Sequence, residues 1–544
     1  MKKIALLSVV ALASTLSLAS CKKSSSGGDN VDSSKAQLTI LTYDGGVGDQ
    51  WLKNAAQIFE LENQERTDFE DGKTGVQVHI TKQRIGGDSL LNTDLTFDMY
   101  FTENINYYAM INNNKMADIT DILTTANPKD DNKKIIDKVD DNLREFMNKS
   151  GKYYAVPFYD CIYGFFYDKD LFDDKLFYMT DAGGWTNDRS EFGTGPNGVA
   201  GDWDDGLPKT YAQFKKLLER MVLKGVTPFT YSSNAQMSYY TARALMSYWS
   251  DDEGFDEANL NYSFNGTAHN IIKVQDENAE TLVPKFDGDK PETEEVAITE
   301  ANGYLLKRQA GVYNALNFAK NYLCFTPSNY KPSSSVATAQ VNFVCGKIQE
   351  EPVGMIVEGT WWENEAVNAF NLAKSMGANS FNYGIMPIPK SSDDKVGEDA
   401  TFLNLNESYG FIASNTSHMK LAKEFFSFLH TDSQLKAFTT ETGMTRALDY
   451  SLTEAEAQNV SSFTRDLISI KQSEHARLLY PCSGKNFFID NSYIFNSTTW
   501  LWSTVDLGEN PVVKFIATPS LSAQDYFAQH INVISASKWS DIIG

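Results

Sequence analysis

GMIVEGTWWEN, residues Gly354–Asn364, contains a short apolar run that is followed at once by an acid, a glycine and two tryptophans. The run Met355–Val357 predicts a buried strand, which Glu358 and the glycine after it end. In an open α/β sheet, ligands bind beyond the carboxyl ends of the strands. We therefore expect the Glu358 carboxylate and the indole of Trp361 at such a crevice, where a sugar ring can stack on the aromatic face and its hydroxyls can bind fixed acceptors. Trp362 is interpreted as packing.

Length and charge narrow the class of protein. The chain has 544 residues, which predicts two or more domains, and its 42% hydrophobic and 22% charged content is typical of a globular protein. The net charge is −23. Such an acidic balance argues against partners made of nucleic acid and against adsorption to an anionic membrane.

The N-terminus has the pattern of an exported lipoprotein. Two lysines precede the apolar run Ile4–Leu18, which is shorter than a membrane span. The sequence Leu18-Ala19-Ser20-Cys21 then resembles a bacterial lipobox. We predict a signal peptide over residues 1–20, a lipid on Cys21, and a flexible linker to residue 35, since Lys22–Lys35 lacks core-forming residues. The predicted location is the cell envelope, on the outer side of the cytoplasmic membrane or in the periplasm.

Strands and helices alternate near the start of the predicted domain. Strands are expected over residues 37–43, 76–80 and 95–101, and a helix over the stretch from Trp51 to Phe59, where apolar residues recur every three to four positions. This alternation predicts a parallel sheet with crossover helices. The loops after the first and third strands open on one edge, so we expect Asp44, Glu103 and Asn104 to converge there.

Polar and aromatic residues also follow a strand that a proline ends. Ala155–Pro157 is a predicted strand, followed by Tyr159 and Asp160 and then by a second strand over Gly164–Tyr167. A strand that is interrupted and resumed in another element is typical of a chain that passes between two lobes. Asn406, just before a further predicted strand that ends at Ile412, is another candidate for the site.

Three helices are expected farther along, over residues 208–223, 303–322 and 418–430, and the first and third of them have an apolar face. In the first of them, Thr210 and Gln213 have the spacing of a capping box.

Two segments have weak periodicity and are interpreted as solvated insertions, residues 180–206 and 251–299. In the first, Asp202, Asp204 and Asp205 are residue types that bind calcium, but the alternation and the closing glutamate of an EF-hand are absent. No metal site is predicted.

After Cys21, four cysteines remain: Cys161, Cys324, Cys345 and Cys482. A bridge between Cys324 and Cys345 and free buried thiols are both consistent with the sequence.

These motifs, in this order, resemble the extracellular solute-binding proteins of bacterial carbohydrate ABC transporters, the group that includes maltose-binding protein. The matching segments include LTILTYDGGVGDQWLKNAAQIFE, YYAVPFYDCIYGFFYDKDLF, VGMIVEGTWW and YGIMPIP. The resemblance implies a two-lobed α/β fold of the type II periplasmic-binding-protein kind, with a mixed sheet flanked by helices in each lobe and several hinge crossings. Mapped onto this chain, the first lobe comprises residues 36–155 and 409–452, and the second comprises residues 156–408 and 453–544.

The resemblance also implies a function and its partners. The family's ligand contacts correspond here to Asp44, Glu103–Asn104, Tyr159–Asp160 and Trp361. The expected protein is a monomer without a cofactor or catalytic residues, which captures a sugar or oligosaccharide by hinge closure and delivers it to the permease subunits of an ABC importer, with the membrane contacted only through the lipid.

Two alternatives stay open at this point. The same fold could bind a peptide, a polyamine or a metal ion. A surface glycoside hydrolase would need two carboxylates on either side of one bond, and no stretch shows such a pair distinct from solvated acidic loops. The HExxH, GxSxG and GxxxxGK[ST] motifs are absent from the sequence.

Overall fold

The computed structural model of the protein describes residues 31–103, 105–232, 239–324, 330–333, 335–405, 408–481, 485, 487 and 510–544. The predicted lipobox with Cys21 lies outside these residues, as do Asn104, Asn406 and Cys482. Within the described residues, no helix combines the length and the apolar character needed to cross a bilayer.

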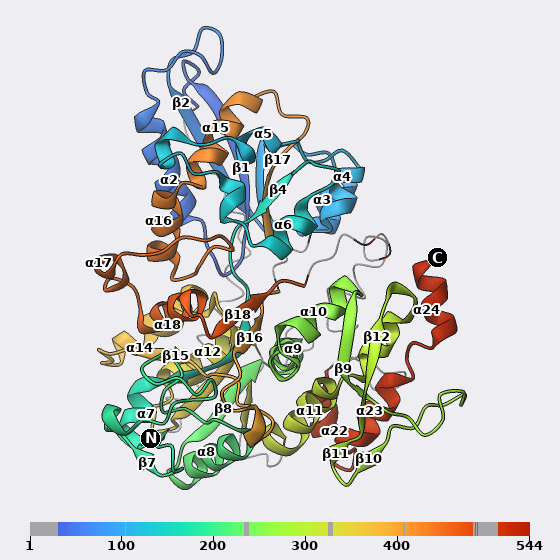
Figure 1. The fold of residues 1–544 in the computed structure, drawn as a ribbon. Coiled ribbons are helices and arrows are strands. Elements are labelled where there is room, and N and C mark those ends of the chain that lie inside the picture. Colours follow the sequence, from blue (N-terminus) through green and yellow to red (C-terminus); the bar gives the residue numbers. More distant parts are fainter. Residues whose placement is uncertain are drawn as a thin grey trace.

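Two five-stranded mixed sheets form the framework (Figure 1). The strand order of the first sheet is β2-β1-β3-β17-β4, with β1 parallel to both of its neighbours and β17 antiparallel to β3 and β4. Its strands are β1 (Ala36–Tyr43), β2 (Val76–Gln83), β3 (Met99–Glu103), β4 (Ala155–Pro157) and β17 (Ser408–Ile412). Because β1, β2 and β3 are parallel, their carboxyl ends meet at one edge, as the sequence predicts.

The second sheet has the order β13-β8-β14-β5-β15, with β14 at its centre. Strand β14 runs parallel to β8 and antiparallel to β5. The strands are β5 (Tyr163–Asp168), β8 (Thr227–Ser232), β13 (Tyr330–Ser333), β14 (Val353–Gly359) and β15 (Tyr383–Ile385). The chain thus leaves the first sheet after β4 and enters the second at β5, which makes Pro157 to Tyr163 a crossing between the lobes.

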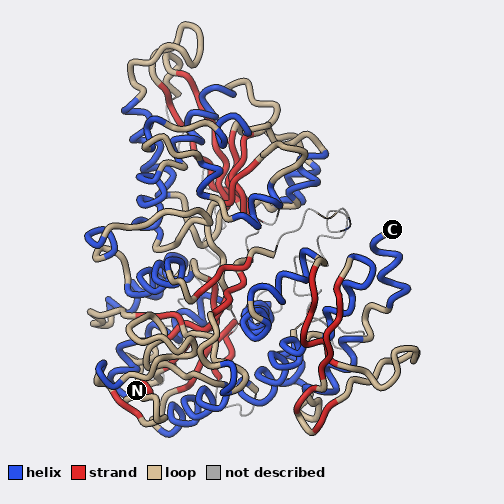
Figure 2. Tube along the Cα trace, in the orientation of Figure 1, coloured by secondary structure: helices blue, strands red, loops and turns tan. Residues whose placement is uncertain are grey.

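Amphipathic helices cover both sheets (Figure 2). Helix α2 (Gln50–Glu62) buries Trp51, Leu52, Ala55, Ala56 and Phe59, the stripe that the sequence pattern predicts. Helix α8 (Tyr211–Leu223) begins at Thr210, whose hydroxyl accepts a hydrogen bond from the Gln213 amide. Helix α15 (Met419–Leu429) buries the predicted face of the 418–430 segment. Each large side chain buried in this way contributes about 1.5–3 kcal/mol to the stability of its lobe.

Further helices flank these layers. They are α3 (Gly87–Asn92), α4 (Tyr107–Asn112), α5 (Thr120–Thr124), α6 (Asp141–Met147), α7 (Lys169–Lys175), α9 (Tyr239–Glu253), α12 (Val336–Cys345), α13 (Trp362–Glu365), α14 (Val367–Ser375), α16 (Asp432–Thr442), α17 (Glu454–Ala457) and α18 (Ser462–Gln472). A short parallel pair of strands, β16 (Ala400–Leu403) and β18 (Ala476–Leu479), lies between the two sheets in the view of Figure 1.

The segment 251–299 differs from the predicted solvated insertion. It contains α10 (Phe255–Ser263) and the antiparallel pair β9 (Gly266–Ile272) and β12 (Thr293–Ile298), and it packs with η5 (Glu300–Arg308) and α24 (Ala536–Ile543) around a separate small core. Phe264 lies 5.6 Å from Trp539 between ring centroids. The apolar residues of this segment therefore pack on residues near the end of the chain. The local periodicity of a sequence cannot predict such distant partners.

The predicted helix over residues 303–322 is broken into three parts: η5, α11 (Ala310–Phe318) and η6 (Ala319–Leu323). Gln309, between the first two parts, has ψ of 139° and is not helical. Its side chain bonds to Asn261 and to the Glu257 carbonyl, and these contacts position the bend. The C-terminal helices α22 (Pro511–Ala517) and α23 (Ala523–Ile531) follow beside α11 (Figure 1).

Candidate functional site

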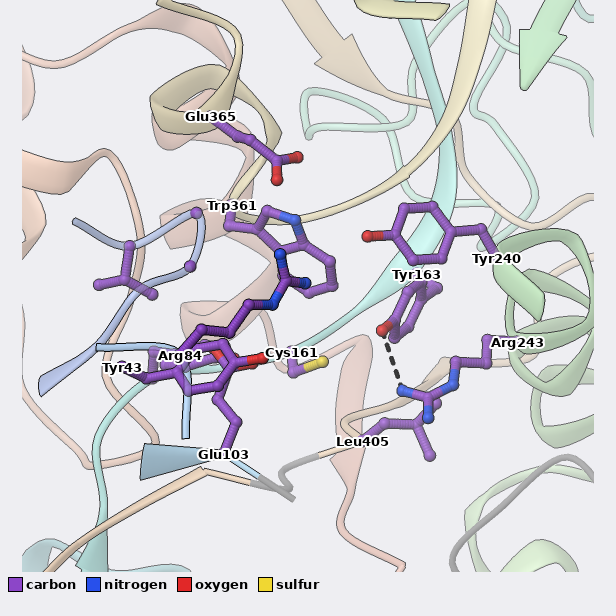
Figure 3. A pocket seen from close by; sticks show the side chains of 14 residues that line it. Tyr43, Arg84, Glu103, Cys161, Tyr163, Tyr240, Arg243, Trp361, Glu365 and Leu405 are labelled. Atoms are coloured by element: carbon purple, nitrogen blue, oxygen red, sulfur yellow. Dashed lines mark hydrogen bonds between the residues drawn. The ribbon is translucent and has the colours of Figure 1, made fainter. Parts of the chain in front are cut away.

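A cavity of about 110 Å³ lies where loops of the first sheet face elements of the second (Figure 3). One wall comes from the carboxyl ends of β1, β2 and β3, and the other from β5, β14 and α9. The residues that line the cavity are Tyr43, Gly45, Gly46, Val47, Arg84, Glu103, Tyr159, Cys161, Tyr163, Tyr240, Arg243, Trp361, Glu365 and Leu405.

Trp361 forms one wall, directly after β14. Its indole meets the rings of Tyr163 and Tyr240 edge-on, at centroid distances of 5.2 Å and 6.1 Å. A Cβ at Gly46 would lie 2.4 Å from the indole, and a Cβ at Gly359 would lie 2.2 Å from it. Only glycine fits at these two positions, so a loop of the first lobe and a strand of the second both contact this tryptophan closely. Its neighbour Trp362 is fully buried, as the sequence predicts.

Glu103 and Tyr159 come together at the opposite wall. The Tyr159 hydroxyl donates a hydrogen bond of 2.8 Å to the Glu103 carboxylate, which fixes the acceptor at the end of β3. Burial raises the pKa of Tyr159 well above its usual value, so the hydroxyl remains a donor. The structure therefore brings three of the predicted site residues, Glu103, Tyr159 and Trp361, to one cavity.

Asp44 is close to this edge but does not line the cavity. Its carboxylate is half exposed and pairs with Lys82 at 3.2 Å.

Asp160 lies at the crossing between the lobes and not at the cavity. It is 1% exposed. Its carboxylate accepts hydrogen bonds from Asn404 at 2.6 Å and Thr445 at 2.6 Å and pairs with Lys471 at 2.9 Å. These partners belong to three different segments of the chain. The arrangement suits a residue that joins crossing segments, because no carboxylate oxygen is left to contact a ligand.

Glu358 is also buried away from the cavity. The Gln340 side-chain amide donates to Glu365 at 3.0 Å and lies 3.4 Å from Glu358, so one amide serves both carboxylates. Burial raises the pKa of both acids, and the charge of Glu365 raises the pKa of Glu358 further. Of the two, only Glu365 reaches the cavity.

Three charged residues of the site were not foreseen: Arg84, Arg243 and Glu365. Glu365 is four positions after Trp361, at the spacing that places two residues on one helical face. Arg84 directly follows β2, so the strand-end rule that selects Glu103 also selects this residue. Arg243 donates a hydrogen bond of 2.9 Å to the Tyr163 hydroxyl from the first turns of α9. No local pattern indicates that this helix faces the cavity.

Among the described cysteines, Cys161, Cys324 and Cys345 form no disulfide. A Cys324–Cys345 bridge, one of the two possibilities consistent with the sequence, is thus absent. Burial raises the pKa of Cys324 to about 12 and that of Cys345 to about 11. Cys161 lines the cavity, and its sulfur is directed into it in Figure 3.

A family model of bacterial extracellular solute-binding proteins matches residues 48–436. The chain belongs to this family. Among solved structures, this solute-binding protein is similar to apo RafE from Streptococcus pneumoniae, with 15% identity, 94% of this chain and 99% of that chain covered, and a TM-score of 0.53.

It is also similar to a chitin oligosaccharide binding protein (12% identity, 92% and 98% covered, TM-score 0.52) and to the GacH receptor of Streptomyces glaucescens (13%, 94% and 98%, 0.51). At these identities the likeness concerns the fold, and it confirms the predicted two-lobed α/β architecture. No curated protein matches the chain significantly.

Proposed function

We propose that this solute-binding protein captures a sugar or oligosaccharide in the interlobe cavity and delivers it to an ABC importer. The observation that carries the proposal is the composition of the cavity. Trp361, Tyr163 and Tyr240 supply apolar ring faces and edges, and Glu103, Glu365, Arg84 and Arg243 supply hydrogen-bonding groups. A saccharide needs both, because its C–H faces are apolar and its hydroxyls each require a partner.

The structural neighbours support this class of ligand. One neighbour is RafE in complex with raffinose, with a TM-score of 0.53, and another is named a chitin oligosaccharide binding protein. The family that matches this chain is described by its binding of a solute.

In the proposed mechanism the lobes rotate about the crossing segments and close on the ligand. A ligand shifts the open–closed equilibrium only by its higher affinity for the closed state, and contacts from both walls provide that difference. Glu103 and Trp361 lie on opposite walls, so a solute that bridges them stabilises the closed form.

The decisive experiment is calorimetric titration with a panel of oligosaccharides that includes raffinose, chitooligosaccharides and maltooligosaccharides. We expect one class to bind, and we expect Trp361→Ala to weaken that binding about tenfold, since an aromatic stacking contact contributes about 0.5–1.5 kcal/mol. Trp185→Ala is the matched control, because Trp185 is half-buried in the second lobe outside the cavity.

The Cys161 thiol gives an independent readout. A bound ligand should slow its reaction with a maleimide, whereas Cys345, which is fully buried outside the cavity, should stay unreactive with and without ligand. If no saccharide on the panel binds, or if Trp361→Ala binds the active one as tightly as the unmodified protein, the sugar assignment is wrong.

The anchor and the transporter complete the proposal. Lipid on Cys21 would hold the protein at the membrane surface and raise its local concentration near the permease. Radiolabelled palmitate should enter the protein in bacterial cells, and Cys21→Ser should abolish both this labelling and recovery in the membrane fraction. Labelling that persists in Cys21→Ser would place the lipid elsewhere.

A further inference from the structure

Three aspartates of the 180–206 segment lie together on a loop of the second lobe. Each of Asp202, Asp204 and Asp205 has a carboxylate oxygen within 4.8 Å of an oxygen of the other two. Among the described residues, no lysine or arginine forms an ion pair with any of the three. Three like charges at this separation repel each other strongly unless a positive charge or a proton neutralises them.

The central carboxylate is buried and incompletely bonded. Asp204 is 1% exposed, and its Oδ1 has no hydrogen-bond partner in the described structure. Oδ1 of Asp205 is also a buried atom without a partner. A buried carboxylate oxygen without a partner costs free energy, so these two atoms require a partner such as a cation, a proton or an ordered water.

The other carboxylate oxygens are fixed by the loop. The Asn197 amide N–H donates to Asp204 Oδ2 at 3.1 Å, the Asn197 side chain donates to Asp202 Oδ2 at 2.7 Å, and the Gly201 N–H donates to Asp205 Oδ2 at 2.6 Å. These bonds hold one oxygen of each carboxylate and leave Oδ1 of Asp204 and of Asp205 for another partner.

We propose that Asp202, Asp204 and Asp205 bind a Ca²⁺ ion. The donor set consists of hard carboxylate oxygens, which Ca²⁺ prefers, and it includes neither histidine nor cysteine as zinc or copper would favour. The expectation from sequence that no metal binds here rested on the missing EF-hand pattern, whereas the structure brings the three acids together without that pattern.

The site would fasten the insertion to the body of its lobe. The Gly397 N–H donates to the Pro196 carbonyl at 2.9 Å, and the Trp203 ring packs on Phe402 of β16 at 5.5 Å. An ion at the three aspartates would therefore cross-link a loop that packs on Phe402. Phe402 is three residues before Leu405, which lines the cavity. The inference is independent of the sugar assignment, because none of its ligands lines that cavity.

A proton is the competing explanation. Burial and the neighbouring Asp202 raise the pKa of Asp204 to about 9, so a neutral Asp204 could satisfy the cluster without a metal. The two explanations differ in their response to added Ca²⁺, which affects stability only if a site exists for it.

The test uses the purified protein after EDTA treatment and dialysis. Millimolar Ca²⁺ should raise the melting temperature by at least about 2 °C, with a dissociation constant on the order of 10⁻⁴ M, and Mg²⁺ should do so less. Tb³⁺ should become luminescent on excitation of tryptophan, since Trp203 lies between two of the ligands in sequence.

Asp204→Asn should lose both responses while melting no lower than the unmodified protein in EDTA, because a buried amide needs neither a proton nor a counter-charge. Asp393→Asn, at an exposed aspartate of the same lobe, should keep both responses. If Ca²⁺ leaves the melting temperature of the unmodified protein unchanged and Tb³⁺ gives no sensitised emission, the proposal is overturned. The same holds if Asp204→Asn folds and retains both signals.

Discussion

Glu358 and Glu365 share one donor, the side-chain amide of Gln340, directly behind the wall that Trp361 forms. Because the folded state raises the pKa of both carboxyls, it retains protons that the unfolded chain has already released. The pair therefore stabilises the fold at low pH, and this contribution is lost as the pH rises above the ordinary glutamate range of about 4.3. The protonation state of Glu365 at the cavity thus depends on the charge of its buried neighbour Glu358.

Glu358→Gln should reduce the loss of stability that accompanies a rise in pH. The substitution removes one of the two coupled charges and keeps a hydrogen-bonding side chain of the same size. Between about pH 5 and pH 8, we expect the melting temperature of the variant to fall less than that of the unmodified protein, because each pKa unit corresponds to about 1.4 kcal/mol. Calorimetric melts at several pH values measure the difference.

Glu145→Gln, at an exposed residue of α6, is the control and should leave the pH profile unchanged. Parallel profiles for Glu358→Gln and the unmodified protein would show that the pair does not retain a proton.

At the scale of single residues, the sequence predicts which residues lie at strand ends better than it predicts which partners their side chains contact. Glu103 and Trp361 were found because each lies at the carboxyl end of a predicted strand, and the structure places both at the cavity. Asp160 and Glu358 satisfy the same rule, yet one bonds to crossing segments and the other points to Gln340. Side-chain direction and partners distant in sequence decide this difference, and neither can be derived from spacing.

Helix α9 connects the cavity to the middle of the molecule. Its first turns carry Tyr240 and Arg243, and its last turn carries Asp251, which is paired with Lys390 at 3.0 Å. Both side chains of the pair are 1% exposed. The Asp251 carboxylate also accepts a hydrogen bond of 2.9 Å from the Thr401 N–H, so the pair fixes the helix against β16.

Lys390→Met should be strongly destabilising. It leaves a buried carboxylate without its counter-charge, which costs about 3–5 kcal/mol, and the transition of the second lobe should move to lower temperature in calorimetry. The double variant Asp251→Asn with Lys390→Met should regain much of this loss, since no charge is then buried and the acceptor for Thr401 is kept.

Lys152→Met provides the matched comparison, because Lys152 pairs with Asp118 at 2.9 Å on the surface, where water screens the pair, and its loss should change the stability little. A double variant as unstable as Lys390→Met alone would show that packing, and not the charge, stabilises this junction.

Helices with a regular spacing of apolar residues could be predicted from the sequence. Elements whose apolar residues pack on distant parts of the chain could not. The sequence places α2, α8 and α15 within a few residues, because their apolar stripes face sheets that run alongside them. The β9–β12 pair was missed, since its alternate residues pack on Trp539 and other residues near the end of the chain. The fold class was accessible because the order of the elements, and not their exact limits, determines it.

In the whole molecule, Asp160 holds together the segments that cross between the lobes. It follows β4 of the first sheet and precedes β5 of the second. Asn404 precedes β17, Thr445 follows α16, and Lys471 lies on α18, so one carboxylate connects four parts of the chain. The cavity of about 110 Å³ is smaller than the roughly 300–1,000 Å³ of common ligand sites, so the proposed capture of an oligosaccharide requires the lobes to separate first.

Asp160→Asn should shift the lobes toward separation. The amide no longer attracts Lys471 as a charge partner, which weakens the link between α18 and the crossing segments without removing the acceptor for Asn404. We expect a broader and longer distribution of interlobe distances in single-molecule fluorescence transfer between dyes on the two lobes. The apparent affinity for the ligand should fall, because the closed state that binds it is then less populated and part of the binding free energy is used to close the lobes.

Asp118→Asn, which breaks a surface pair within the first lobe, should leave both measurements unchanged. If Asp160→Asn shows the distances of the unmodified protein with and without ligand, the buried junction does not control closure. The hinge would then have to lie in backbone segments that the Asp160 carboxylate does not contact, and ligand capture would depend on the cavity walls alone.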